Sequence, residues 1–195
     1  LEGYELVTHA IALAIEIRRD VNTHPLVSKY FRVLEPAEMI PVQFRPSGLA
    51  SYIDPGVTWA QALEAFRHDE FVLDPTRLTL VCGTAGFDGT QFKGLLAAEY
   101  EIQLNKTSRN SILLQTNINN TRSDVANLLR VLVEISRKID ATLKDGGAPA
   151  QAAFAQRVKS LMEDVPGLPN FSRFHDRFRT DPSGTTLEGD MRSAF

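Results

Sequence analysis

The sequence predicts an α+β fold in which helices cover one face of a short, mostly antiparallel sheet. The chain has 195 residues, 43% of them hydrophobic, so it is long enough to bury a core in one domain with appendages or in two small domains. Apolar residues recur at helical spacing in several segments, and runs rich in β-branched residues lie between them. The order strand, helix, strand, strand, helix in the second half packs two helices on one face of a small sheet.

The first predicted element is an amphipathic helix over residues 4–21. Its apolar residues recur at intervals of three and four, with charged residues on the far side. They are Leu6, Val7, Ala10, Ile11, Leu13, Ala14, Ile17 and Val21. Residues 22–25 end the helix, because Pro25 disfavours helix in the residue before it and lacks the donor needed to continue.

Residues 26–73 predict an irregular, proline-rich connection with one short helix, since proline and glycine interrupt it repeatedly. Helical spacing returns at 58–68, where Thr58 is placed to cap the helix. Residues 71–73 and, more strongly, 78–82 have the branched residues typical of strands.

The next predicted elements are a helix over 92–100 and two strands, 101–106 and 111–117. The helix has inward-facing apolar residues at helical spacing. The strands are joined by a short polar segment, so they form a hairpin or a strand pair interrupted at 108–110.

The strongest predicted helix begins after Thr121 and ends at Gly146. Thr121 and Asp124 have the spacing of a capping box, with Asp in place of the usual Glu. A further helix covers 150–165, and we expect residues 166–195 to form an extended, loosely packed tail.

Charge and cysteine content exclude several classes of protein. A net charge of -3 and a pI near 5.8 give no electrostatic reason to expect nucleic acid or a membrane as a partner. The single cysteine, Cys82, excludes an intrachain disulfide and indicates a reducing compartment, the cytoplasm. No metal site is expected from the histidine spacing, and the first helix is far short of the ~20 apolar residues that span a bilayer. The chain begins with Leu, so we expect a piece of a longer protein.

Several short sequences follow one another in a distinctive order. They are Asp74–Leu80, Phe92–Gly94, Asn105–Asn110, Thr121–Asp124 and the tail from Phe171 to Phe195. In this order and spacing they resemble the C-terminal part of the bacterial Orn/Lys/Arg decarboxylases. Those enzymes use pyridoxal phosphate (PLP) and have the fold of aspartate aminotransferase.

The resemblance implies that lysine, ornithine or arginine loses its α-carboxylate as carbon dioxide, leaving an amine of the kind used in polyamine biosynthesis. The chemistry belongs to the cofactor, whose ring accepts the electrons left on Cα. Residues 1–25 are then a helix that connects a large PLP-binding domain to the small domain, 74–165. The segment 26–73 lies between them, and 166–195 is the tail. Such enzymes are homo-oligomers, dimers or larger.

The chain lacks the lysine that holds PLP in this family, which follows a serine or threonine and a histidine. None of the lysines here has a histidine before it. The aspartate for the pyridine nitrogen and the histidine that stacks on the ring also belong to the large domain. We therefore expect no catalytic residue in this chain, no PLP bound by the chain alone, and no activity without the large domain.

The resemblance places substrate recognition at Asn105, Lys106 and Thr107, with Arg109 in the turn that follows. Related lysine and ornithine enzymes have a glutamate where this chain has Asn105, although a neutral amide can still accept from an ammonium or guanidinium. Lys106 is equally well explained as a solvated surface residue, and Arg109 as a turn residue that faces water. The glycine-rich segment 83–89 lacks the ending of a phosphate-binding loop, and we expect it beside the active site.

Two alternatives belong to other classes. One is a non-catalytic interaction module that has kept the fold and pairs with a full-length enzyme as a regulatory subunit. The other is the small domain of a different PLP enzyme, such as an aminotransferase, for which Arg109 is the candidate to bind a substrate carboxylate. The length of the reading frame upstream of Leu1 discriminates between them.

Overall fold

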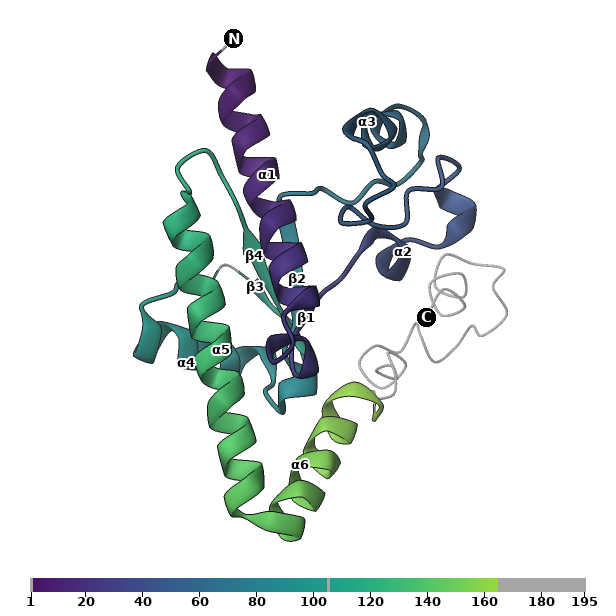
Figure 1. Cartoon of the computed structure of the whole chain (residues 1–195). Coiled ribbons are helices and arrows are strands. Elements are labelled where there is room, and N and C mark those ends of the chain that lie inside the picture. Colours follow the sequence, from purple (N-terminus) through teal and green to yellow (C-terminus); the bar gives the residue numbers. More distant parts are fainter. Residues whose placement is uncertain (1, 105, 165–195) are drawn as a thin grey trace, which may run out of the picture. The chain divides into compact units, whose positions relative to one another are not determined.

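The computed structural model describes residues 2–104 and 106–164, and the predicted tail lies outside them. The chain divides into two compact units, Leu1–Glu163 and Asp164–Phe195, and all elements named below belong to the first (Figure 1). The helices are α1 (Glu2–Thr23), α2 (Pro36–Met39), α3 (Trp59–His68), α4 (Gly89–Tyr100), α5 (Arg122–Asp145) and α6 (Gly147–Met162). The strands are β1 (Arg32–Val33), β2 (Arg77–Val81), β3 (Lys106–Thr107) and β4 (Ser111–Gln115), and short 3-10 turns are η1 (Val27–Lys29), η2 (Val42–Phe44) and η3 (Gly83–Ala85).

The four strands form one antiparallel sheet in the order β1-β2-β4-β3. In the central pair, Leu78 lies opposite Leu114 and Leu80 opposite Ile112. These four side chains are buried, and because strand residues alternate between faces they share one face of the sheet. Residues on the other face, such as Leu113, remain partly exposed. The α+β fold with an antiparallel sheet is thus confirmed.

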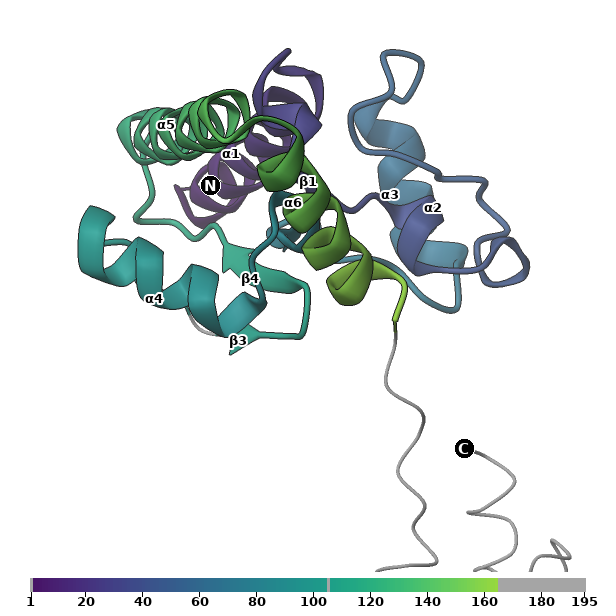
Figure 2. The same cartoon turned by 90° about the horizontal axis from the view of Figure 1, so that it is seen from below.

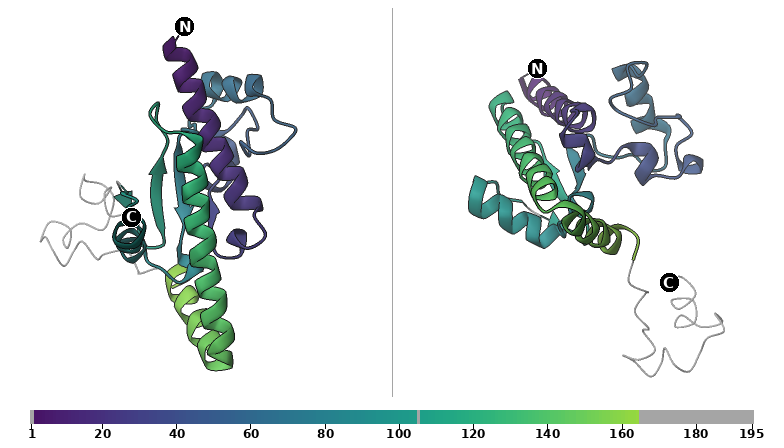
Figure 3. Two further views of the ribbon diagram at one scale, coloured as in Figure 1. Left: turned by 60° about the vertical axis from the view of Figure 1, so that its left-hand side comes forward. Right: turned by 60° about the horizontal axis from the view of Figure 1, so that its bottom comes forward.

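Helices α1 and α5 lie side by side (Figures 2 and 3). Together with α4 they contribute to the core that covers the inner face of the sheet. Their buried apolar residues include Leu13, Ala14, Ile17 and Val21 of α1, Phe92 and Leu96 of α4, and Val125, Leu128, Leu132 and Ile135 of α5. The stripe predicted for α1 therefore faces the core from Ala10 onwards, whereas its first members, Leu6 and Val7, are exposed.

The start of α5 has the capping box that the sequence predicts. The backbone N–H of Thr121 donates to Oδ2 of Asp124 at 2.8 Å, and the side chain of Thr121 accepts from the backbone N–H of Asp124. This pairing satisfies donors that the first turn of a helix leaves open.

The segment 26–73 is more regular than predicted. It contains β1, which pairs with β2 and completes the sheet, as well as α2 and α3. The strand predicted at 71–73 is wrong, since those residues are neither helix nor strand. The strand predicted at 101–106 is much shorter, because β3 begins only at Lys106.

Helix α3 packs through small residues, and its large apolar residues are exposed. Ala62 and Ala65 are buried against Leu49 and Tyr52 in a second, smaller cluster. Trp59, Leu63 and Phe66 are substantially exposed. Among the described residues, none of the helices combines the length and apolarity that crossing a bilayer requires.

Cys82 follows β2 and is fully buried. Burial raises the pKa of its thiol to about 12. Because the thiolate is the reactive form, we expect the native protein to react with an aromatic disulfide reagent at pH 8 at least about 100-fold more slowly than the denatured protein does. The released chromophore measures both rates, and equal rates would contradict a closed core around Cys82.

Candidate functional site

The residues predicted for substrate recognition lie at one edge of the sheet. Lys106 pairs with Leu113 and Thr107 with Ile112, so β3 is the outer strand beside β4. The backbone register places Lys106 on the open face of the sheet, and its side chain is exposed. A small cavity of about 220 Å³ adjoins it, lined by both β3 residues and by hydroxyl groups of Thr79, Ser108 and Ser111. Asn105 lies outside the described residues.

Residues 108–110 form the turn between β3 and β4. The N–H of Ser108 donates to the carbonyl of Ser111 at 2.8 Å, and the two hydroxyls lie 2.7 Å apart. The side chain of Arg109 does more than face water, because Nη2 donates to the carbonyl of Ser160 in α6 at 2.7 Å. The turn is therefore attached to the last turns of α6, which are 51 residues further along the chain.

A second cavity, of about 460 Å³, lies between this turn, the start of α4 and α6. It is lined mainly by polar groups, including Arg109, Arg157, Asp88, Thr107 and Ser160. Arg157 donates from Nε to the carbonyl of Gly86 at 3.2 Å and pairs with Asp88 at 3.5 Å. Thr107 and Arg109 are thus brought together around this cavity, whereas Lys106 does not line it.

The glycine-rich segment 83–89 lies beside the β3–β4 turn, and its glycines permit close approach. A Cβ atom on Gly89 would lie 2.2 Å from the carbonyl oxygen of Ser108 and 2.5 Å from that of Ser111. The N–H of Gly83 donates to the carbonyl of Asn110 at 2.9 Å. Two glycines therefore position the β3–β4 turn against the start of α4.

Two features of the described residues bear on PLP binding: the start of α4 and the exposure of the lysines. The first turn of α4 is capped by the carboxylate of Asp88, which accepts from the N–H of Gln91 at 2.8 Å and so occupies the place a phosphate would take. Lys93 is half-buried and the other described lysines are exposed. Within residues 2–104 and 106–164, no cluster of acidic, histidine or cysteine side chains is suited to hold a metal ion.

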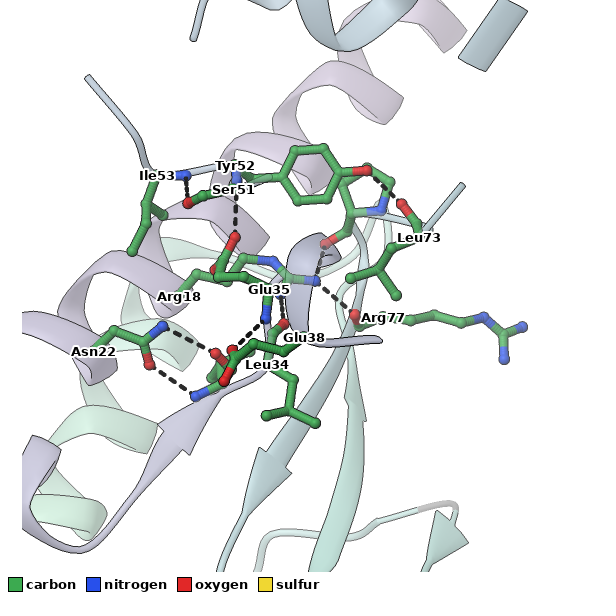
Figure 4. Close-up of polar contacts among 12 residues, drawn as sticks. Arg18, Asn22, Leu34, Glu35, Glu38, Ser51, Tyr52, Ile53, Leu73 and Arg77 are labelled. Carbon is green, nitrogen blue, oxygen red and sulfur yellow. Dashed lines mark hydrogen bonds and ion pairs between the residues drawn. The ribbon is translucent and has the colours of Figure 1, made fainter. Parts of the chain in front are cut away.

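A buried polar network centres on Arg18 of α1, which has no exposed surface (Figure 4). Its Nη1 donates to the carbonyl of Leu34 at 2.7 Å. Its Nη2 donates to the carbonyls of Arg77 at 2.8 Å and Pro75 at 3.4 Å. Glu35, also buried, supplies a carboxylate oxygen 3.8 Å from Nη1. Burial lowers the pKa of Arg18, and the charge of Glu35 opposes that shift.

Glu35 extends the network to the segment before α3. Its Oε2 accepts from the backbone N–H of Tyr52 at 2.8 Å, and the backbone N–H of Glu35 donates to Oε2 of Glu38 at 3.0 Å. The Tyr52 ring lies 5.4 Å from the guanidinium of Arg18, and its hydroxyl donates to the carbonyl of Leu73. One cation thereby ties α1, the residues before β2 and the loop around Tyr52 together (Figure 4).

The sequence contains one indication of this network, the position of Arg18 within the apolar stripe of α1, but a charged residue is normally expected to be exposed. Arg18 follows Ala14 by four residues and precedes Val21 by three, so helical spacing places it on the buried stripe. Its partners are mostly backbone carbonyls, and no residue pattern identifies those.

Comparison of the chain with protein-family models and with curated proteins finds no match. The resemblance to the decarboxylases therefore rests on the residues quoted above, in their order and spacing.

Proposed function

We propose that this chain is the C-terminal part of a PLP-dependent decarboxylase of basic amino acids and contributes substrate recognition and assembly. The observation that carries the proposal is the position of Lys106 and Thr107, which the resemblance assigns to substrate recognition. They lie at the open edge of the sheet, beside a turn that Gly89 and α6 hold in place. A rigid edge of this kind suits a group that must meet a substrate held by another domain.

Within this proposal the positive charge of Lys106 determines which end of the substrate it contacts. Its ammonium matches the α-carboxylate of a basic amino acid and repels the distal cation. The distal cation is left to the preceding position, where the family has a glutamate and this chain has Asn105. When PLP is bound in the complete enzyme, it supplies the electron-accepting ring, and the present chain supplies polar groups at the substrate.

The test uses the protein encoded by the whole reading frame that contains this chain. Purified with PLP, it is expected to release carbon dioxide from one of L-lysine, L-ornithine or L-arginine, with the corresponding amine as product. The 195-residue chain mixed with PLP is expected to show no imine absorbance. Failure of the complete protein on all three amino acids would contradict the proposal, and an imine band lost on replacing one lysine of the chain would contradict its inactivity.

A non-catalytic regulatory module is the second candidate, and the carboxylate of Asp88 at the start of α4, where a phosphate would otherwise bind, favours it. A reading frame that begins at or near Leu1, together with binding to a separate full-length decarboxylase, would support this candidate over the first. The aminotransferase alternative has less support, because Arg109, its carboxylate-binding candidate, directs Nη2 to Ser160.

Replacing Lys106 with alanine in the complete enzyme is expected to raise KM about tenfold or more, since a hydrogen bond to a charged group contributes roughly 1.5–3 kcal/mol. The free energy of unfolding should change by less than about 0.5 kcal/mol, because the side chain is exposed. Lys159→Ala, an exposed lysine on α6, is the matched control and should leave KM unchanged. An unchanged KM in the Lys106 variant would remove this residue from the site.

A further inference from the structure

A third cavity, of about 550 Å³, lies between the segment that follows α4, the C-terminal half of β4 and the first turns of α5. Its volume is in the range of small-molecule sites, which run from about 300 to 1,000 Å³. Lys106 and Thr107 do not line it, although Leu113, the strand partner of Lys106, lines both this cavity and the small one at the edge.

The lining of this cavity has one sign of charge. It includes two carboxylates, Glu101 and Asp124, and among the described residues that line it there is no lysine, arginine or histidine. The remaining polar groups are largely amides, among them Gln103 and Gln115. Apolar side chains, including Leu114 and Leu128, supply the rest of the wall. A ligand that matches this lining carries a positive charge and an apolar part.

The two carboxylates are held differently. Asp124 is fixed by the capping box, with Oδ2 accepting from the N–H of Thr121, and this hydrogen bond lowers the pKa of the carboxyl group. Among the described residues, the carboxylate of Glu101 has no hydrogen-bond or ion-pair partner. One acidic group is therefore ordered and ionised, and the other is available.

The backbone of Glu101 has an unusual conformation for a residue other than glycine. Glu101 is the C-cap of α4 with φ 58°, and among the described non-glycine residues it alone has a positive φ. Glycine is the residue that normally takes this conformation at the end of a helix. A glycine here would remove the carboxylate and also relax the backbone, so a loss of affinity would not be accompanied by a loss of stability.

We propose that this cavity binds an organic cation of the alkylammonium class, with the ammonium at Glu101 and Asp124 and the alkyl chain against the apolar wall. An anion would face two carboxylates, and a neutral ligand would leave them unused. A bare metal ion is disfavoured, because no group of three suitable ligands exists in the described part of the chain. The proposal is independent of the decarboxylase assignment and holds for the isolated chain.

The test compares three probes that share one alkyl chain and differ in charge: hexylammonium, 1-hexanol and hexanoate. Titrated into the 195-residue chain at neutral pH and constant ionic strength, with calorimetry or amide chemical shifts as readout, hexylammonium should bind at least about tenfold more tightly than hexanol. Hexanoate should show no saturable binding. Equal binding of the three probes, or no binding of hexylammonium at millimolar concentration, would overturn the proposal.

Two variants locate the site. Glu101→Gly should weaken hexylammonium binding at least about fivefold while the midpoint of thermal unfolding stays the same or rises. Glu99→Gln removes a neighbouring carboxylate that pairs with Lys138 and does not line the cavity, and it should leave affinity within about twofold. Unchanged affinity in Glu101→Gly, or equal losses in both variants, would show that Glu101 does not bind the cation.

Discussion

Replacing Arg18 with methionine is expected to lower the free energy of unfolding by about 3–5 kcal/mol, the range found when one partner of a buried ion pair is removed. The guanidinium has no exposed surface and donates to the carbonyls of Leu34 and Arg77. Methionine fills much of the same volume, so the loss arises mainly from polar groups left without donors and from the uncompensated charge of Glu35. Urea denaturation monitored by circular dichroism measures the change.

Arg19→Met is the matched control, because Arg19 is the next residue of the same helix and is exposed. It should change the unfolding free energy by less than about 0.5 kcal/mol. The double variant Arg18→Met, Glu35→Gln should recover part of the loss, since it removes the orphaned charge as well. A loss below about 1 kcal/mol for Arg18→Met would mean that water replaces the guanidinium at the carbonyls.

The variant Gly89→Ala is expected to destabilise the protein by about 3 kcal/mol, at the upper end of the usual range for overpacking. The new Cβ would lie 2.2 Å from the carbonyl oxygen of Ser108 and 2.5 Å from that of Ser111. Both neighbours are backbone atoms, so no rotamer change relieves the contact and the β3–β4 turn has to move. Because Lys106 and Thr107 begin that hairpin, the proposed function predicts that the substrate affinity of the complete protein falls as well.

Gly94→Ala tests the same substitution on the same helix with the opposite expected sign. Nothing lies within 4 Å of the added methyl group, and Gly94 has no unusual backbone angle. Alanine is a better helix former than glycine by roughly 0.5–1 kcal/mol, so this variant should gain about that much stability. Thermal unfolding of the two variants side by side decides the matter, and losses of equal size would refute the steric argument at Gly89.

The helices could be predicted from the sequence because their signal is local and repeated. The stripe from Leu6 to Val21 predicts α1 to within two residues at each end, and the Thr121–Asp124 box marks the start of α5. The strand β1 could not be predicted, since it has two residues and exists only through its pairing with Leu80 and Val81, almost fifty positions away. Residues 71–73 have strand-forming side chains but no neighbouring strand to pair with.

In the candidate site, too, the features that depend on local sequence could be predicted and those that depend on tertiary packing could not. The position of Lys106 and Thr107 at a strand end follows from local alternation and turn residues, and they form the outer strand β3. The bond from Arg109 to Ser160 depends on how α6 folds back, which no local pattern records. The role of Glu101 as the C-cap of α4 could not be predicted, because a sequence indicates the end of a helix chiefly when glycine occupies that position.

Both outer strands of the sheet, β1 and β3, are only two residues long. A sheet grows by adding chains to the unpaired N–H and C=O groups of its edges, and edges this short present few such groups to a second molecule. Lys106 places a positive charge on the β3 edge, which further opposes the approach of an identical strand, whereas Arg32 on the β1 edge is paired with Glu38. The short length that made β1 unpredictable from the sequence therefore also protects the protein against edge-to-edge aggregation.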